Sequence, residues 1–303
     1  MELRQVTENT YYIPGPTNLG LFVEDKNAIL IDSGNDESAG RKIFRLLEEK
    51  GWQLSKIINT HSNADHIGGN AYLQKKTGCD ILATALESIF ISEPLLEPFL
   101  LWGAFPFKAL RNKFLQAQPS KVTHIINTEG IIKDTPLHAF PLEGHFIQMI
   151  GVKTPDDVLF IADSLFSLEI INKYGLTVKS NIEQALNAFS WLEKLSAKLF
   201  IPAHAQPTGD IGDLIRVNRD QVEQINKKII TYCDQPVSKE RILQLLVNDY
   251  HLQLSSVQFV LTHITVSAHL SYLNDKHIIK PIFEDGKMLW VNIGVETGTV
   301  KKD

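Results

Sequence analysis

Residues 59–70, with the sequence NTHSNADHIGGN, gather side chains that bind metal ions. His61, Asp65 and His66 fall within six positions, directly after an apolar run. Imidazole nitrogens and carboxylate oxygens together suit zinc and similar divalent ions, and a site with an open coordination position activates water. Glycines follow at positions 68 and 69, where we expect the loop to turn tightly into a helix. The stretch therefore indicates a metal-dependent hydrolytic site.

Asn63 interrupts this pattern, because it stands between the histidines where another strong donor would be expected. The oxygen of a neutral amide is a poorer zinc ligand than an imidazole nitrogen. The alternative is that Asn63 caps a helix or stabilises the loop without touching metal, since asparagine favours such local hydrogen bonds.

Four further candidates are spread along the chain. Asp32, Asp163 and His204 each follow a short apolar run that predicts a buried strand, and His145 lies in the stretch PLEGH. Catalytic residues collect on loops held by a rigid scaffold, so we expect the strand ends to deliver these side chains to one rim. For Asp32 the alternative is a cap on the turn before Gly34.

Strands and helices that would position this site follow from the apolar pattern. Residues 10–32 are predicted to form strands interrupted by Pro14-Gly15-Pro16. Gly51 is a helix stop. The predicted helices cover residues 37–51, 70–76, 181–195 and 212–232.

The chain changes character after about residue 210. Ser238 can cap a helix, and Asp285-Gly286 between two apolar runs predicts a β-hairpin. The predicted helices cover residues 238–249, 255–261 and 265–276, and the hairpin strands cover 278–283 and 287–291. Three helices and a hairpin resemble a winged helix.

Charge argues against nucleic acid as a partner of this last segment. Residues 236–303 carry seven Lys and Arg against seven Asp and Glu, whereas a nucleic-acid reader normally has a basic stripe. We therefore expect a role in packing, in dimerisation or in covering the active site.

Residues 86–119 stand out by their aromatic content. The functional interpretation is an apolar lid or substrate wall beside the metals, and the alternative is a homodimer contact or extra core packing. The aromatic residues are Phe90, Phe99, Trp102, Phe105, Phe107 and Phe114.

Length and composition predict a globular, cytoplasmic protein of about two domains. The chain has 303 residues and a net charge of −5, which argues against a general nucleic-acid or membrane binder. Cys79 and Cys233 form no paired metal-binding pattern, which suggests reduced thiols. We expect no signal peptide and no membrane span.

The order of these motifs resembles the metallo-β-lactamase superfamily over roughly residues 8–210. The resemblance implies a four-layer αββα sandwich of α/β class, with two metal positions at one edge. The first position would take His61, Asn63 in place of the usual His, and His145, and the second would take Asp65, His66 and His204. Asp163 would bridge both, and Asp32 would orient the histidine loop.

Further expectations follow from this resemblance. Residues 1–210 would form the metallo-β-lactamase-like domain, 211–235 a linking helix, and 236–303 a winged-helix-like C-terminal domain. One or two Zn²⁺ ions are the expected cofactor, with manganese or iron as alternatives that tolerate oxygen donors better. Because Asn63 weakens the first position, we predict that the second binds metal more tightly.

The expected activity is hydrolysis of a small ester, thioester or related acyl substrate, with Asp65 orienting or deprotonating the water. Alternatives are a phosphodiesterase or ribonuclease-like hydrolase, and a metal-binding regulatory protein whose site Asn63 has degraded. The substrate-binding residues are unknown from sequence. Lys173 and Tyr174 are similar to carboxylate-binding residues of hydroxyacylglutathione hydrolase, and a solvated loop is the alternative.

Overall fold

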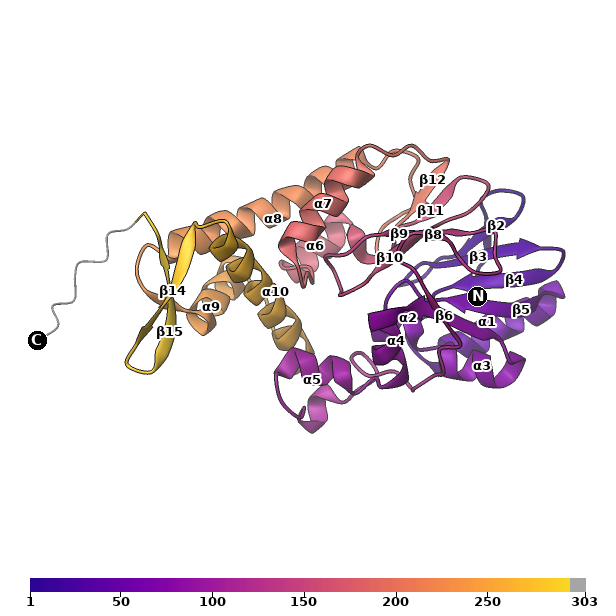
Figure 1. Ribbon diagram of the computed structural model, residues 1–303, viewed down its shortest axis with the longest axis horizontal. Helices are drawn as coiled ribbons and strands as arrows, with labels where there is room; N and C mark the ends of the chain where they lie inside the picture. Colours follow the sequence, from indigo (N-terminus) through magenta and orange to yellow (C-terminus); the bar gives the residue numbers. More distant parts are fainter. Residues whose placement is uncertain (295–303) are drawn as a thin grey trace, which may run out of the picture.

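A computed structural model describes residues 1–294 and contains two β-sheets stacked face to face with helices outside them (Figure 1). The first sheet has the strand order β1-β2-β3-β4-β5-β6-β7, and the second has the order β12-β11-β10-β9-β8. The strands of the first sheet are β1 (Arg4–Gln5), β2 (Thr10–Ile13), β3 (Leu19–Glu24), β4 (Asn27–Ile31), β5 (Gln53–Ile58), β6 (Asp80–Thr84) and β7 (His124–Ile126). Those of the second are β8 (Gly130–Ile131), β9 (His138–Pro141), β10 (Ile150–Lys153), β11 (Val158–Phe160) and β12 (Leu199–Ile201).

Alternation along β4 shows how the sequence fills two cores at once. Ile29 and Ile31 point between the sheets, where they join Phe160 of β11 in one apolar cluster. Ala28 and Leu30 point to the opposite face and pack beneath helices. Successive side chains of a strand alternate between its faces, so an uninterrupted apolar run is what a strand buried on both faces requires.

Helices cover the outer face of each sheet. On the first sheet lie α1 (Glu37–Lys50) and α3 (Asn70–Thr77), and on the second lie α7 (Ile182–Leu192) and the start of α8 (Gly212–Tyr232). Asp36 caps the start of α1, and Gly51 ends it in the left-handed conformation, as predicted. The layer order helix, sheet, sheet, helix confirms the expected αββα sandwich.

The direction of the strands brings several loops to one edge. β4 pairs in parallel with β5, and β11 pairs in parallel with β12. The carboxyl ends of parallel strands meet at the same edge of a sheet, so the loops after β4 and β5 open at one edge of the first sheet and those after β11 and β12 at one edge of the second. The two edges lie at one rim of the sandwich, because His66 after β5 contacts Asp163 after β11. Two short helices lie in these loops, α2 (Ala64–Ile67) after β5 and the 3₁₀ turn η2 (Ala162–Ser164) after β11.

The aromatic segment forms α4 (Ala85–Ser92), α5 (Leu96–Trp102) and the 3₁₀ turn η1 (Lys108–Leu110). Its Leu101, Leu110 and Leu115 pack against Val260 of the C-terminal part. Five of its six aromatic side chains are exposed, which excludes core packing as their role. These are Phe99, Trp102, Phe105, Phe107 and Phe114. Phe90 instead packs edge-on against Phe146 at 5.3 Å between ring centroids.

The C-terminal part contains two helices beside a three-stranded sheet of order β13-β15-β14 (Figure 1). Ser238 caps the first helix, and the predicted hairpin turns at Asp285-Gly286, both at positive φ. The elements are β13 (Val237–Ser238), α9 (Lys239–Asp249), α10 (Ser256–Asp275), β14 (Ile279–Glu284) and β15 (Lys287–Asn292).

The prediction of two helices over 255–261 and 265–276 is wrong, because α10 is continuous. The hydroxyl of Thr265 donates to the carbonyl of Leu261, and that of Ser267 donates to the carbonyl of His263, so these polar residues are satisfied inside the helix. Buried side chains such as Val266 hold the helix against its neighbours, and tertiary packing overrides weak local propensity.

The long helix α8 joins the two parts of the chain. Its Ile215 and Val222 belong to the core under the second sheet, whereas Ile225 and Ile229 belong to the core of the C-terminal part. The predicted boundaries at residues 210 and 235 stay predictions, and residues 295–303 of the predicted last domain lie outside the described residues. Among residues 1–294, no helix is long and apolar enough to cross a membrane.

Candidate metal centre

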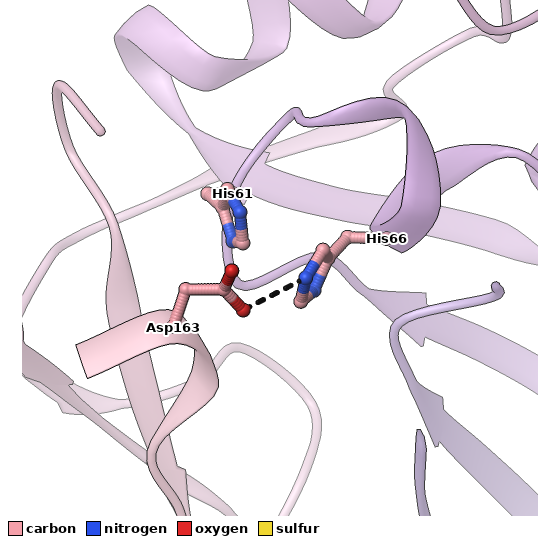
Figure 2. A group of neighbouring side chains, drawn as sticks. All are labelled: His61, His66 and Asp163. Carbon is pink, nitrogen blue, oxygen red and sulfur yellow. Dashed lines mark ion pairs between the residues drawn. The ribbon is translucent and has the colours of Figure 1, made fainter. Parts of the chain in front are cut away.

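Side chains from separate loops converge at the rim of the sandwich. His61 and His66 come from the loop after β5, and Asp163 comes from η2 after β11 (Figure 2). Nε2 of His66 lies 3.0 Å from Oδ1 of Asp163, and the two imidazole rings are 4.0 Å apart between centroids. One ligand atom from each of the three lies within 4.8 Å of the others.

His204, from the loop after β12, reaches the same carboxylates. Its Nε2 lies 3.1 Å from Oδ2 of Asp163 and 3.4 Å from Oδ2 of Asp65. Asp65, His66 and His204 form a second group of potential ligands within 4.8 Å of one another. These are the residues that the family resemblance implied for the second position.

His145 and Asn63 lie beside the first group. Nε2 of His145 is 3.6 Å from Oδ2 of Asp163 and 2.8 Å from Oδ1 of Asn63. Asn63 occupies the N-cap position of α2, but its side chain makes no capping hydrogen bond. Capping by Asn63 is therefore wrong, whereas the alternative that it stabilises the loop stays open, since its amide donates to Glu97. The division of ligands between two metal positions stays a prediction.

In each of the four imidazoles, Nδ1 contacts a group outside the cluster. The partners are the hydroxyl of Thr60 for His61, the carboxylate of Asp32 for His66, the carbonyl of Val178 for His145, and the carbonyl of Pro16 for His204. A hydrogen bond at one ring nitrogen sets the tautomer and leaves the other free to bind metal. All four Nε2 atoms are thus left for the cluster.

Three buried atoms at the centre have no hydrogen-bond partner within residues 1–294: Nε2 of His61, Nε2 of His66 and Oδ1 of Asp163. The last two lie 3.0 Å apart, but without hydrogen-bond geometry. Buried polar atoms nearly always have a hydrogen-bond partner, so three unpartnered nitrogen and oxygen atoms that point toward one place indicate a missing partner. A divalent cation fits this set of imidazoles and carboxylates.

Asp32 holds the loop from beneath. Its Oδ2 lies 2.7 Å from Nδ1 of His66 and accepts the hydroxyl of Thr60, while its Oδ1 accepts the backbone N–H of Thr60. Asp32 and Ala162, directly before Asp163, both have positive φ. Backbone strain of this kind persists where the surroundings enforce it, often at functional sites. The contacts agree with an orienting role and not with a turn cap.

Charge is distributed unevenly over the cluster. Burial favours the neutral form of His66 and His204, but neighbouring carboxylates outweigh it, so the pKa of His66 is raised well above its usual value and that of His204 to about 10. Burial opposes the charged carboxylate of Asp163, yet the nearby imidazoles hold its pKa well below normal. Burial lowers the pKa of His61 and His145.

Metal binding is therefore expected to release protons. Without metal, His66 and His204 keep their protons at pH 7 because their pKa values are raised. A cation must displace both, so we expect release of about two protons per chain and an apparent affinity that rises up to about 100-fold per pH unit around neutrality. Calorimetric zinc titration in buffers of different ionisation enthalpy measures the number of protons, and release of none would contradict the expectation.

Whereas the metal affinity should rise with pH, the free energy of unfolding of the chelator-treated protein should fall. A raised histidine pKa stabilises the folded state fully below the unfolded value of 6.5, and this contribution is lost as pH rises through about 10. Denaturant unfolding of the metal-free protein between pH 6.5 and 10 should accordingly show a falling free energy of unfolding.

Sequence reasoning missed four residues around the cluster. Thr17 donates its hydroxyl to Asp65, and Glu87 accepts from the backbone and hydroxyl of Ser62. Glu97 accepts the amide N–H of Asn63 at 2.7 Å. Lys179 is buried and donates to Thr177, and burial lowers its pKa to about 8. None carries a local motif, so no signal in the sequence marks them.

Lys173 and Tyr174, the candidates for carboxylate binding, are both exposed at the end of α6 (Leu168–Tyr174). The Lys173 ammonium lies 5.0 Å from the centroid of the Tyr174 ring. This arrangement agrees with the solvated alternative.

Sequence comparison supports one family. The sequence model of the metallo-beta-lactamase superfamily matches residues 12–204. A hydroxyacylglutathione hydrolase of Rhodopseudomonas palustris (strain BisB18) is 30% identical over 156 residues, which cover 50% of this chain and 49% of that protein. Another, from Methylococcus capsulatus, is 36% identical over 50 residues, 16% of this chain and 20% of the relative. The chain thus spans about half or less of the length of these relatives.

Solved structures share the fold over nearly the whole chain. A beta-lactamase domain protein from Burkholderia ambifaria has a TM-score of 0.72 at 16% identity and covers 96% of this chain and 93% of its own. A metallo-beta-lactamase family protein from Thermus thermophilus has a TM-score of 0.72 at 17% identity, and the match covers 95% of this chain and 100% of that protein. At such identities the similarity concerns the fold alone, and its extent includes most of the part after α8.

Proposed function

Because this chain belongs to the metallo-beta-lactamase superfamily, we propose that it is a metal-dependent hydrolase. The observation that supports this most is the set of three buried, unpartnered donor atoms on His61, His66 and Asp163, surrounded by imidazoles whose Nδ1 atoms are already engaged. We propose the ligands as His61, Asn63 and His145 for one ion and Asp65, His66 and His204 for the other, with Asp163 between them. Zinc is the proposed metal.

A divalent ion at this site would supply a Lewis acid and lower the pKa of a coordinated water toward about 7. The protein residues then have separate tasks. Asp65 is held by the hydroxyl of Thr17 at 2.7 Å, and its side chain is about one-third exposed, so it faces incoming solvent. Burial opposes the charge on Asp65, but His66 and His204 outweigh it and lower its pKa, which keeps the carboxylate ionised, so that it can bind a cation and orient a water molecule by accepting a hydrogen bond.

The proposed substrate class is a thioester or a related small acyl ester. Its support is the similarity to hydroxyacylglutathione hydrolases, whose name denotes hydrolysis of an acyl-glutathione, a thioester. The surroundings of the cluster are compatible with an acyl group, because Phe146 lies 6.4 Å from the ring of His61 and packs against Phe90. A phosphodiester is the alternative substrate.

Replacing Asp65 by Asn tests the proposal. We expect turnover to fall by about 100-fold or more, because the amide keeps the shape but loses the charge that orients the water and helps to hold the metal. The measurement is the initial rate on a panel of thioesters, esters and phosphodiesters with zinc or manganese added, alongside circular dichroism to verify folding and metal analysis to separate loss of metal from loss of water orientation. Asp213→Asn, at an exposed position on α8, is the matched control.

The same panel separates the alternatives. Turnover of phosphodiesters but not thioesters would redirect the substrate class. No turnover by the wild type on any substrate, with metal bound, would support the regulatory alternative and contradict the hydrolase. Asn63→His adds a further discrimination, because raised metal content with raised activity indicates an impaired enzyme, and raised metal content with lost activity indicates a specialised one.

A further inference from the structure

The carboxylate of Glu97 lies behind the proposed metal ligand Asn63. Glu97 is on α5, in the aromatic segment, and its Oε1 accepts the Nδ2–H of Asn63 at 2.7 Å. The other end of the same amide, Oδ1, lies 2.8 Å from Nε2 of His145. Burial raises the pKa of Glu97 well above its usual value, so a nearby cation would be needed to hold it as a carboxylate. An ionised carboxylate accepts but does not donate hydrogen bonds, and in that form Glu97 fixes which end of the amide faces the cluster.

The contact between Asn63 and His145 is then a meeting of two acceptors. His145 donates its Nδ1–H to the carbonyl of Val178, which leaves a lone pair on Nε2. Nε2 therefore faces the lone pairs of Oδ1 of Asn63 across 2.8 Å. Two lone pairs at this distance repel each other unless a cation binds both, and Asp163 lies 3.6 Å away on the same side.

Glu97 is buried without a positively charged partner among the described residues. It is 4% exposed, it has no Lys, Arg or His within salt-bridge distance in residues 1–294, and Asn63 is its side chain's one hydrogen-bond partner there. Glu87, also buried in the same segment, accepts three hydrogen bonds from Ser62 and Gln148. A buried carboxylate without a counter-charge is costly, and a cation bound by Asn63 would be that counter-charge.

We propose that Glu97 is a positioning residue that makes Asn63 a metal ligand. By accepting the amide N–H, the carboxylate fixes Oδ1 toward His145 and increases the electron density on that oxygen. Carboxylates act in the same way on metal-bound histidines, whose ring N–H they accept. With a cation bound, the ionised Glu97 would also bring negative charge to the position that otherwise has two imidazoles and a shared carboxylate. The aromatic segment thus completes the metal centre in place of the missing imidazole.

The C-terminal part supports this arrangement through α5. Leu101, one turn after Glu97, packs in a cluster with Val260 of α10, and Figure 1 shows α5 at the end of that helix. The position of Glu97 therefore depends on contacts between two distant parts of the chain.

The test is titration of the chelator-treated full chain with Co²⁺, followed by visible absorption, and with Zn²⁺ in competition with a chelator. For the wild type we expect two steps of unequal affinity. Glu97→Gln should weaken the weaker step by about 10- to 100-fold and leave the tighter step within about twofold, as expected when a partner behind a ligand is removed. Glu93→Gln, an exposed carboxylate of the same segment, is the matched control and should change neither step.

A double-mutant comparison shows whether Glu97 acts through Asn63. Asn63→Ala should weaken the same step, and adding Glu97→Gln to it should have no further effect. The proposal is overturned if Glu97→Gln titrates like the folded wild type, if it weakens the Asn63→Ala protein equally, or if the wild type binds a single ion.

The proposal rests on the metal site and not on turnover, so the two can fail separately. A wild type that shows these affinities but hydrolyses nothing would contradict the hydrolase and leave the role of Glu97 standing. An active wild-type enzyme, with metal affinities that do not change in Glu97→Gln, would contradict the role of Glu97 and leave the hydrolase standing.

Discussion

Replacing Asp163 by Asn is expected to remove metal from both positions. Its carboxylate lies 3.0 Å from His66, 3.1 Å from His204 and 3.6 Å from His145, so it contacts ligands of both proposed positions. Changing a group that merely supports a ligand costs about 10- to 100-fold in metal affinity, and loss of a shared charged ligand should exceed that. The metal content after dialysis against a weak chelator measures the effect.

The loss of metal from the Asp163 variant should result from the lost charge and not from unfolding. Asn has nearly the shape of Asp, and the raised pKa values of His66 and His204 depend on the carboxylate, so the variant should also release fewer protons when zinc is added. Asp134→Asn is the matched control, at an exposed residue with positive φ that Asn tolerates. If the Asp163 variant retained two ions per chain, the bridging role would be wrong.

The substitution Gly68→Ala should have the largest effect on stability. A Cβ at this position would lie 2.2 Å from the carbonyl carbon of Asn35 and 2.5 Å from the backbone nitrogen of Asp36, the N-cap of α1. These are backbone atoms that cannot move aside cheaply, so we expect a loss of about 3 kcal/mol in the free energy of unfolding, the upper part of the usual range for overpacking. Urea unfolding measures it.

A second glycine with space around it provides the comparison. A Cβ on Gly209 would come no closer than 3.7 Å to any atom, so Gly209→Ala should change the free energy of unfolding by less than about 0.5 kcal/mol. Equal stability of the two variants would show that the close approach at Gly68 does not constrain the loop. The Gly68 variant should also bind metal more weakly, because His66, two residues earlier, would be displaced.

Local signals in the sequence were sufficient for most of the scaffold. Gly51 ends α1, Ser238 begins α9, and Asp285-Gly286 forms the hairpin turn, each through hydrogen bonds or backbone conformations within a few residues. The break expected within α10 was wrong because its polar residues bond inside the helix and its buried face packs on neighbouring elements, which no local pattern records.

For the site, the sequence by itself determined the donor types and the four strand ends that carry them, because an apolar run followed by His or Asp is a local pattern. It could not determine which way the amide of Asn63 faces, since Glu97 reaches it from 34 positions away. Nor could it explain Gly68, whose φ of −62° any residue adopts. Glycine is required at position 68 because the backbone of Asn35 lies against it, and not because the loop turns tightly there. These features come from contacts between segments far apart in the chain, and only tertiary packing decides them.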